Sequence, residues 1–324
     1  MRKKKVYIIL GSVLCVFMGM LGFSCAREGI SDFFIEDFFE QTGESQNVSP
    51  EKNNQQNSNN VSQKEKHEGD FVQASIIHAS GKTLKRRIRV PNGYKRTKCK
   101  PDSIGVFLRN YPMKKDGSPV RLYNGSKKGN QNAHVAVFKL PIEAEDLQQC
   151  ADSVMRVYAE YFWKTGQEER IKFHFVDGFL ADYISWRDGG RIQVGSTTSW
   201  VNSAAYDASY QNFKKYLRMV FAYAGTLSME AESRRIDIGR LRIGDVFIKG
   251  DSPGHVVMVV DICKKADGKK AFLLAQGYMP AQEFHLLKNP RHEEDPWYYE
   301  EEVTYPFETP EYIFEEGSLR RLEY

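Results

Sequence analysis

The chain has 324 residues with 46 Lys+Arg and 42 Asp+Glu, and 41% of its residues are hydrophobic. Removing the four basic residues at positions 2–5 from the 46 leaves 42, so the rest of the chain is neutral. A neutral protein gains little from counterion release on a polyanion. This composition argues against nucleic acid as a partner, and the length suits one large domain or two small ones.

The N-terminal segment has the pattern of an export signal. Four basic residues at positions 2–5 precede an apolar run over residues 6–23, an order typical of a secretory signal peptide. Cys25 follows in the stretch LGFSC, which indicates a lipobox with an acylated cysteine. We therefore predict a lipoprotein signal over residues 1–25 and a protein anchored to the cell-envelope membrane, on its periplasmic or surface side. The alternative is an uncleaved anchor, because the run is just long enough to span a bilayer.

Residues 26–70 are predicted to form a disordered tether. Within them, residues 41–70 carry only Val48 and Val61 as sizeable apolar side chains. Such a segment cannot bury enough surface to offset the entropy lost on ordering. Residues 30–39 are richer in Ile and Phe, and they fit either an amphipathic helix or an unstructured apolar stretch.

The next part, residues 71–140, is predicted to be β-rich. The stretch TLKRRIRV alternates in polarity, SIGVFLRNYPM is typical of a strand that leads into a turn, and HVAVFKLPI is typical of another strand. The sequence leaves open whether this part is a separate domain or extends the sheet of the region that follows.

The remainder, residues 141–324, is predicted to be α+β, with helices first and an antiparallel sheet after them. Helical spacing occurs in EDLQQCADSVMRVYAEYFW and in SYQNFKKYLRMVFAYAGT. Three strands are expected in GDVFI, HVVMVVDI and KAFLLAQGY. The first helix starts either near residues 143–147 or, if a turn interrupts the pattern, directly before Cys150.

Cysteine usage leaves a thiol without an obvious partner. Outside the signal and the lipobox, the cysteines are Cys99, Cys150 and Cys263. Three is an odd number, so at least one thiol is free unless it pairs between chains.

Three polar residues fit the roles required in a thiol hydrolase. A cysteine nucleophile needs an imidazole within hydrogen-bond reach, and the imidazole needs a third polar group to orient it. Cys150, at a helix, matches the nucleophile, His255 matches the base, and Gln276, on the strand after the histidine strand, matches the orienting group. Gln149 is a candidate donor to the oxyanion. The alternative interpretation of Cys150 is a buried structural cysteine.

The same stretches resemble a known group of enzymes. QQCADSVMRVYAEYFW, GDVFI, GHVVMVVDI and LLAQGY are similar, in this order, to landmarks of the papain-like peptidoglycan hydrolases, namely the NlpC-type peptidases and the CHAP amidases. The resemblance covers residues 149–279 and implies a papain-like core, with the cysteine helix packed on an antiparallel sheet. It also implies hydrolysis of cell-wall peptides without a cofactor. From about Ile88 onward the chain further resembles an uncharacterised family of bacterial exported lipoproteins.

Other candidate sites are weaker. Trp186, Arg191 and Trp200 lie in aromatic-rich stretches that suit a substrate groove, with an arginine to bind a carboxylate, although the tryptophans also suit a core. The scattered histidines form no HExxH pattern and no CxxC pair is present, so no metal site is predicted. The alternatives to an enzyme are a non-catalytic binding module on the same fold and a structural lipoprotein of the envelope.

Overall fold

Strand β9 (His255–Lys264) lies near the middle of a sheet made by segments from across the chain. The computed structural model describes residues 75–251 and 253–324, which belong to one structural unit. The predicted signal, the lipidated Cys25 and the predicted tether lie outside the described residues.

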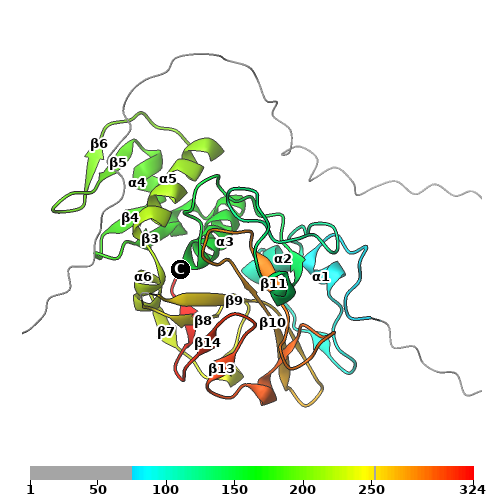
Figure 1. Ribbon diagram of the computed structural model, residues 1–324. Helices are drawn as coiled ribbons and strands as arrows, with labels where there is room; N and C mark the ends of the chain where they lie inside the picture. The colour runs from blue at the N-terminus through cyan, green and yellow to red at the C-terminus, as the bar shows by residue number, and fades with distance from the viewer. Residues whose placement is uncertain (1–74, 252) are drawn as a thin grey trace, which may run out of the picture. The chain divides into compact units, whose positions relative to one another are not determined.

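Short helices and strands alternate along the described chain (Figure 1). The helices are α1 (Leu84–Arg87), α2 (Ile104–Arg109), α3 (Cys150–Lys164), α4 (Tyr183–Arg187), α5 (Tyr210–Tyr223) and α6 (Thr226–Ala231). The other strands are β1 (Lys95–Arg96), β2 (His134–Val137), β3 (Lys172–His174), β4 (Leu180–Asp182), β5 (Gly190–Gln193), β6 (Ser199–Asn202), β7 (Ser233–Arg235), β8 (Val246–Lys249), β10 (Lys270–Gln276), β11 (His285–Leu287), β12 (Tyr298–Tyr299), β13 (Phe307–Glu308), β14 (Ile313–Phe314) and β15 (Leu319–Leu322).

The main sheet has the order β2-β11-β10-β9-β8-β15-β7, with β1 added to β9 and β12 added to β10. All of these pairs are antiparallel. The chain is therefore α+β with a mostly antiparallel sheet, and the strands predicted in GDVFI, HVVMVVDI and KAFLLAQGY are confirmed as β8, β9 and β10. Because β1 and β2 join this sheet, the N-terminal part extends it.

Strand β9 is buried on both faces, which explains its nearly continuous apolar sequence. Val256, Met258 and Val260 pack into the larger core with α3, while Val257 and Val259 pack into a second core. The second core includes Phe307 and Phe314 from the C-terminal hairpin formed by β13 and β14. The period of two along the strand thus separates a helix-covered face from a face covered by the C-terminal segment.

Two predicted strands of the N-terminal part are wrong. TLKRRIRV contains the helix α1, and SIGVFLRNYPM contains the helix α2. In each case two apolar residues that pack into the larger core lie four positions apart, Leu84 and Ile88 in the first and the partly buried Ile104 and the buried Leu108 in the second, which places them on one face of a helical turn. The strand predicted in HVAVFKLPI is confirmed as β2.

The helix α5 is confirmed where helical spacing predicts it. Between α3 and α5 lie two small hairpins, β3–β4 and β5–β6, and the short helix α4. Figure 1 shows α4, α5, β5 and β6 on one side of α3 and the helices α1 and α2 on the other. None of the helices in the described ranges is long and apolar enough to cross a bilayer.

Candidate functional site

Helix α3 begins at Cys150. Its N-cap is Gln149, whose backbone N–H donates to Asp152 Oδ2 over 3.0 Å. The residues before it form tight turns, in which the N–H of Leu147 bonds to the carbonyl of Glu145 and that of Gln149 to Leu147. The upstream start near residues 143–147 is therefore wrong. Cys150 occupies the first helical position, where backbone N–H groups have no partner within the helix.

The end of β10 contacts this first turn directly. A Cβ atom at Gly277 would lie 2.2 Å from Ser153 Oγ and 2.7 Å from the Gln149 carbonyl oxygen. Ser153 Oγ itself donates to that carbonyl over 2.7 Å. Glycine is therefore required at position 277, and it brings the neighbouring Gln276 close to the start of α3.

His255 and Gln276 meet as the sequence predicts. His255 is the first residue of β9 and Gln276 the last of β10, and these strands are antiparallel neighbours. His255 Nε2 lies 2.8 Å from Gln276 Oε1, and both side chains are buried. A carbonyl oxygen only accepts, so the imidazole carries its hydrogen on Nε2. The ring nitrogen Nδ1 then holds the lone pair that can accept a proton.

The Cys150 sulfur lies at the same end of the sheet. The backbone N–H of Val256, the residue after His255, faces the sulfur and lowers the pKa of the thiol. Tyr278 and Tyr312 also lie near the sulfur: burial is the main cause that raises the pKa of both phenols, and an ionised Cys150 would add to it. The same two rings lie 4.7 and 4.9 Å from the His255 ring. Among the described residues, no hydrogen bond joins the sulfur to the imidazole.

Burial keeps both the Cys150 thiol and the His255 imidazole neutral. It raises the pKa of the Cys150 thiol to about 11, to which nearby Asp152 also contributes, while the N–H groups of Ala151 and Val256 oppose the shift. Burial likewise lowers the pKa of His255 to about 4, against the hydrogen bond to Gln276. At neutral pH the pair is therefore a thiol and an imidazole, and proton transfer would accompany attack on a substrate.

A pocket of about 320 Å³ lies against Cys150. Its walls come from the start of α3, the end of α5, the start of α6 and the turn before β9. The side chains and backbone that line it belong to Asp146, Leu147, Gln149, Cys150, Ala151, Asp152, Phe221, Ala222, Ala224, Gly225, Thr226, Asp251, Pro253, Gly254 and Met279. Its size fits a small-molecule or peptide-end ligand.

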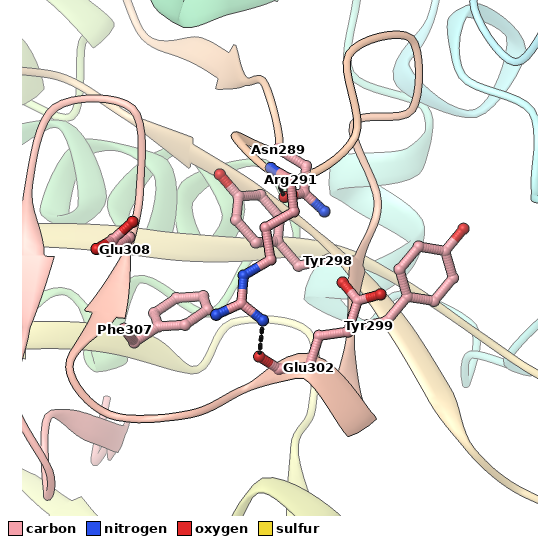
Figure 2. Close-up of a pocket in the computed structure, with 7 residues that line it drawn as sticks. All are labelled: Asn289, Arg291, Tyr298, Tyr299, Glu302, Phe307 and Glu308. Atoms are coloured by element: carbon pink, nitrogen blue, oxygen red, sulfur yellow. Dashed lines mark hydrogen bonds between the residues drawn. The ribbon is translucent and has the colours of Figure 1, made fainter.

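A second cavity lies far along the sheet and is too small for a substrate. Figure 2 shows the residues around it, where Arg291 donates to the carbonyl of Glu302. Its volume is about 10 Å³, roughly that of one water. The pocket at Cys150 is therefore the better candidate site.

Asp152 is a buried acid in the wall of the candidate pocket. Its Oδ2 accepts from the Gln149 backbone, while its Oδ1 has no partner within the described structure. Burial raises the pKa of this carboxyl to about 8, against the backbone hydrogen bond from Gln149. Asp152 is thus largely protonated at neutral pH, which limits its effect on the thiol.

The sequence matches a protein family for which no function is described. A family model described as "Domain of unknown function (4846)" matches residues 84–321. The chain belongs to this family. No curated protein and no solved structure matches the chain. The matched span contains Cys150, His255 and Gln276, so the whole candidate site belongs to the family domain.

The predicted substrate residues lie in different places. Gln149 lines the pocket, but its Nε2 donates to Asp146 Oδ1 over 3.1 Å. Trp186, Arg191 and Trp200 are not among the lining residues: they belong to α4, β5 and β6.

The three groove residues have local partners instead. The Arg191 guanidinium stacks over the Trp186 ring at 4.5 Å and donates to the Trp186 carbonyl. The Trp186 indole N–H donates to Asn212, and Trp200 packs on Phe179. These contacts suit a role in holding the hairpin β5–β6 on α5.

Several residues around His255 and Gln276 were missed in the sequence. Glu311, Lys128 and Tyr312 come from segments outside residues 149–279 and carry no motif of their own. Tyr278, two residues after Gln276, is the one with a detectable signal, because its side chain points to the same face of an extended segment.

A metal site is not found in the described part of the chain: its residues offer no group of three or more His, Cys, Asp or Glu side chains that could bind an ion.

Proposed function

We propose that the chain is a thiol hydrolase of amide bonds, exported and held on the envelope membrane by a lipid on Cys25, with cell-wall peptides as its substrates. The observation that carries the proposal is the 2.8 Å bond from His255 Nε2 to Gln276 Oε1, beside a cysteine at a helix start that opens on a pocket. The arrangement supports the papain-like core that the ordered landmarks imply.

In this mechanism His255 Nδ1 takes the thiol proton of Cys150 as the sulfur attacks the substrate carbonyl carbon. The oxygen gains the negative charge, which N–H groups of the first turn of α3, having no partner within the helix, stabilise. The imidazolium returns its proton to the leaving amine, and the C–N bond breaks to give a thioester. Water, deprotonated by the same imidazole, then releases the acid and restores the thiol. Gln276 holds the ring in the required tautomer throughout.

Thiol alkylation tests the proposal. Iodoacetamide labelling at neutral pH, mapped by mass spectrometry, should modify Cys150 in the native protein. The His255→Ala variant should react at least about 10-fold more slowly, because its thiol loses the proton acceptor. His292→Ala, which removes a partly exposed histidine away from Cys150, is the control. Equal rates in wild type and His255→Ala, with folding intact, would contradict the mechanism.

A second candidate is a non-catalytic binding module on the same fold. It is favoured by the 6% exposure of Cys150 and by the raised pKa of its thiol, since a buried neutral thiol is unreactive. A module of this kind would keep the pocket and the His255–Gln276 bond, and its Cys150 would resist alkylation until the protein unfolds.

A further inference from the structure

A polar network lies behind Gln276, on the side away from His255. Gln276 Nε2 donates to Glu311 Oε2 over 2.8 Å. Its second hydrogen points toward His285 Nε2 at 3.4 Å. His285 Nδ1 donates to the Glu283 carbonyl over 2.8 Å, so its Nε2 carries a lone pair and accepts. Both partners of the Gln276 amide nitrogen are therefore acceptors.

This network determines the direction in which the Gln276 amide lies. A carboxylate paired with a lysine cannot donate a hydrogen bond, so the NH₂ group must face Glu311. The carbonyl oxygen must then face His255, and His255 must carry its hydrogen on Nε2. The orientation of one carboxylate thus sets the tautomer of the imidazole two hydrogen bonds away.

Glu311 reaches this place from the tip of the hairpin β13–β14. The tip closes with a hydrogen bond from the Thr309 N–H to the Tyr312 carbonyl, 2.9 Å long. Lys128 binds the Glu311 carboxylate in an ion pair, and both side chains are at most 10% exposed. Asn130 Nδ2 lies 3.3 Å from the other carboxylate oxygen. The carboxylate is therefore held at both oxygens and cannot rotate away.

We propose that Glu311 is a positioning residue of the hydrolase: paired with Lys128, it holds Gln276 so that His255 presents its basic Nδ1 to Cys150. The C-terminal hairpin, outside the stretch that resembles the papain-like enzymes, then completes the site. This assignment rests on the proposed function for its catalytic consequence, but the tautomer that it requires can be observed without any turnover.

The test compares Glu311→Gln with Glu308→Gln, which replaces an exposed carboxylate on the same hairpin. The full chain, ¹⁵N-labelled at histidine, is studied by long-range ¹H–¹⁵N NMR, with His255 assigned by its loss in His255→Ala. Wild type and Glu308→Gln should show a single Nε2–H tautomer. Glu311→Gln should show a mixture, because the new amide can donate as well as accept.

Kinetics give the second readout. Alkylation of Cys150 in Glu311→Gln should slow by about 10–100-fold, a loss of the size seen when the group that orients a metal-ligating histidine is removed, with an altered pH profile. Glu311→Asp, which keeps the acceptor, should recover part of the rate. Circular dichroism and thermal unfolding establish that each variant folds.

The outcomes separate the two ideas. An unchanged single tautomer in folded Glu311→Gln would overturn the positioning role even if Cys150 remains reactive. A mixed tautomer in a protein whose Cys150 does not depend on His255 would support the positioning role and overturn the hydrolase.

Discussion

The two ends of β9 bear buried polar clusters of opposite character. At the far end, Asp261 is fully buried and accepts from Arg96 Nε and Arg109 Nε, each over 2.7 Å. At the near end, His255 is neutral and bonds to an amide beside a pocket. The charged cluster has both carboxylate oxygens occupied and serves to hold β1 and α2 on the sheet. The neutral cluster leaves His255 Nδ1 with a lone pair, as the proposed proton transfer requires.

The largest expected effect is on the free energy of unfolding, when Asp261 is removed from the charged cluster. Asp261→Ala leaves two guanidinium groups partly buried without a counter-ion, which costs about 3–5 kcal/mol for a broken buried pair. Urea denaturation should show this loss in the free energy of unfolding, whereas Asp267→Ala, in an exposed turn, should change it little. A loss below about 1 kcal/mol for Asp261→Ala would mean that water or other groups satisfy the arginines.

The next effect concerns the neutral end and pH. The pKa of His255 is lowered to about 4 by burial, so its neutral form is favoured in the folded state. Its contribution to stability is present above the unfolded pKa of about 6.5 and is lost as the pH falls toward 4. Between pH 6.5 and 4.5 the wild type should lose about 2–3 kcal/mol more than His255→Asn.

Urea denaturation at each pH measures that difference. His292→Asn is the control, because the His292 ring is more than a third exposed and pairs with Glu302 on the surface. If His255→Asn follows the same pH dependence as the wild type, the imidazole is hydrated and the site is more open than the structure indicates.

The smallest expected effect concerns the aromatic rings that cover His255 at the neutral cluster. Tyr312→Ala removes a ring 4.9 Å from the imidazole and should cost about 1 kcal/mol, the usual worth of an aromatic contact. It should also raise the pKa of His255 toward that of a solvated histidine, because burial is the main cause of the shift. An NMR titration measures this change, with Tyr206→Ala, which removes an exposed ring, as the control.

The near end of β9 was largely predictable from the sequence. Strands β8, β9 and β10 have clear apolar runs bounded by turn residues, and adjacent antiparallel strands place His255 beside Gln276. The start of α3 at Cys150 was left open, because Leu147 continues the helical spacing while the chain around it turns. The helix start is fixed by local hydrogen bonds, one that Asp152 Oδ2 accepts from the Gln149 N–H and one that Ser153 Oγ donates to the Gln149 carbonyl.

The far end and the outer network were not predictable. The segments of α1 and α2 are too short for periodicity to distinguish a helical turn from a strand. Glu311 and Lys128 lie 183 positions apart, and neither belongs to a pattern, since an ion pair of this kind depends only on how the hairpin folds back. Arg96 and Arg109 meet Asp261 for the same reason, through packing that no local signal encodes.

The glycine at position 277 has a consequence for how the site tolerates change. Only the Ser153 hydroxyl and main-chain atoms lie between the first turn of α3 and the end of β10. The distance between the Cys150 sulfur and the Gln276 amide is therefore set by how closely the two backbones approach. Substitutions within either hydrophobic core can change the volume of a side chain without changing that distance. A single methyl group added at position 277 would force the two apart, and under the proposed mechanism activity would then be lost although every reacting atom is still present.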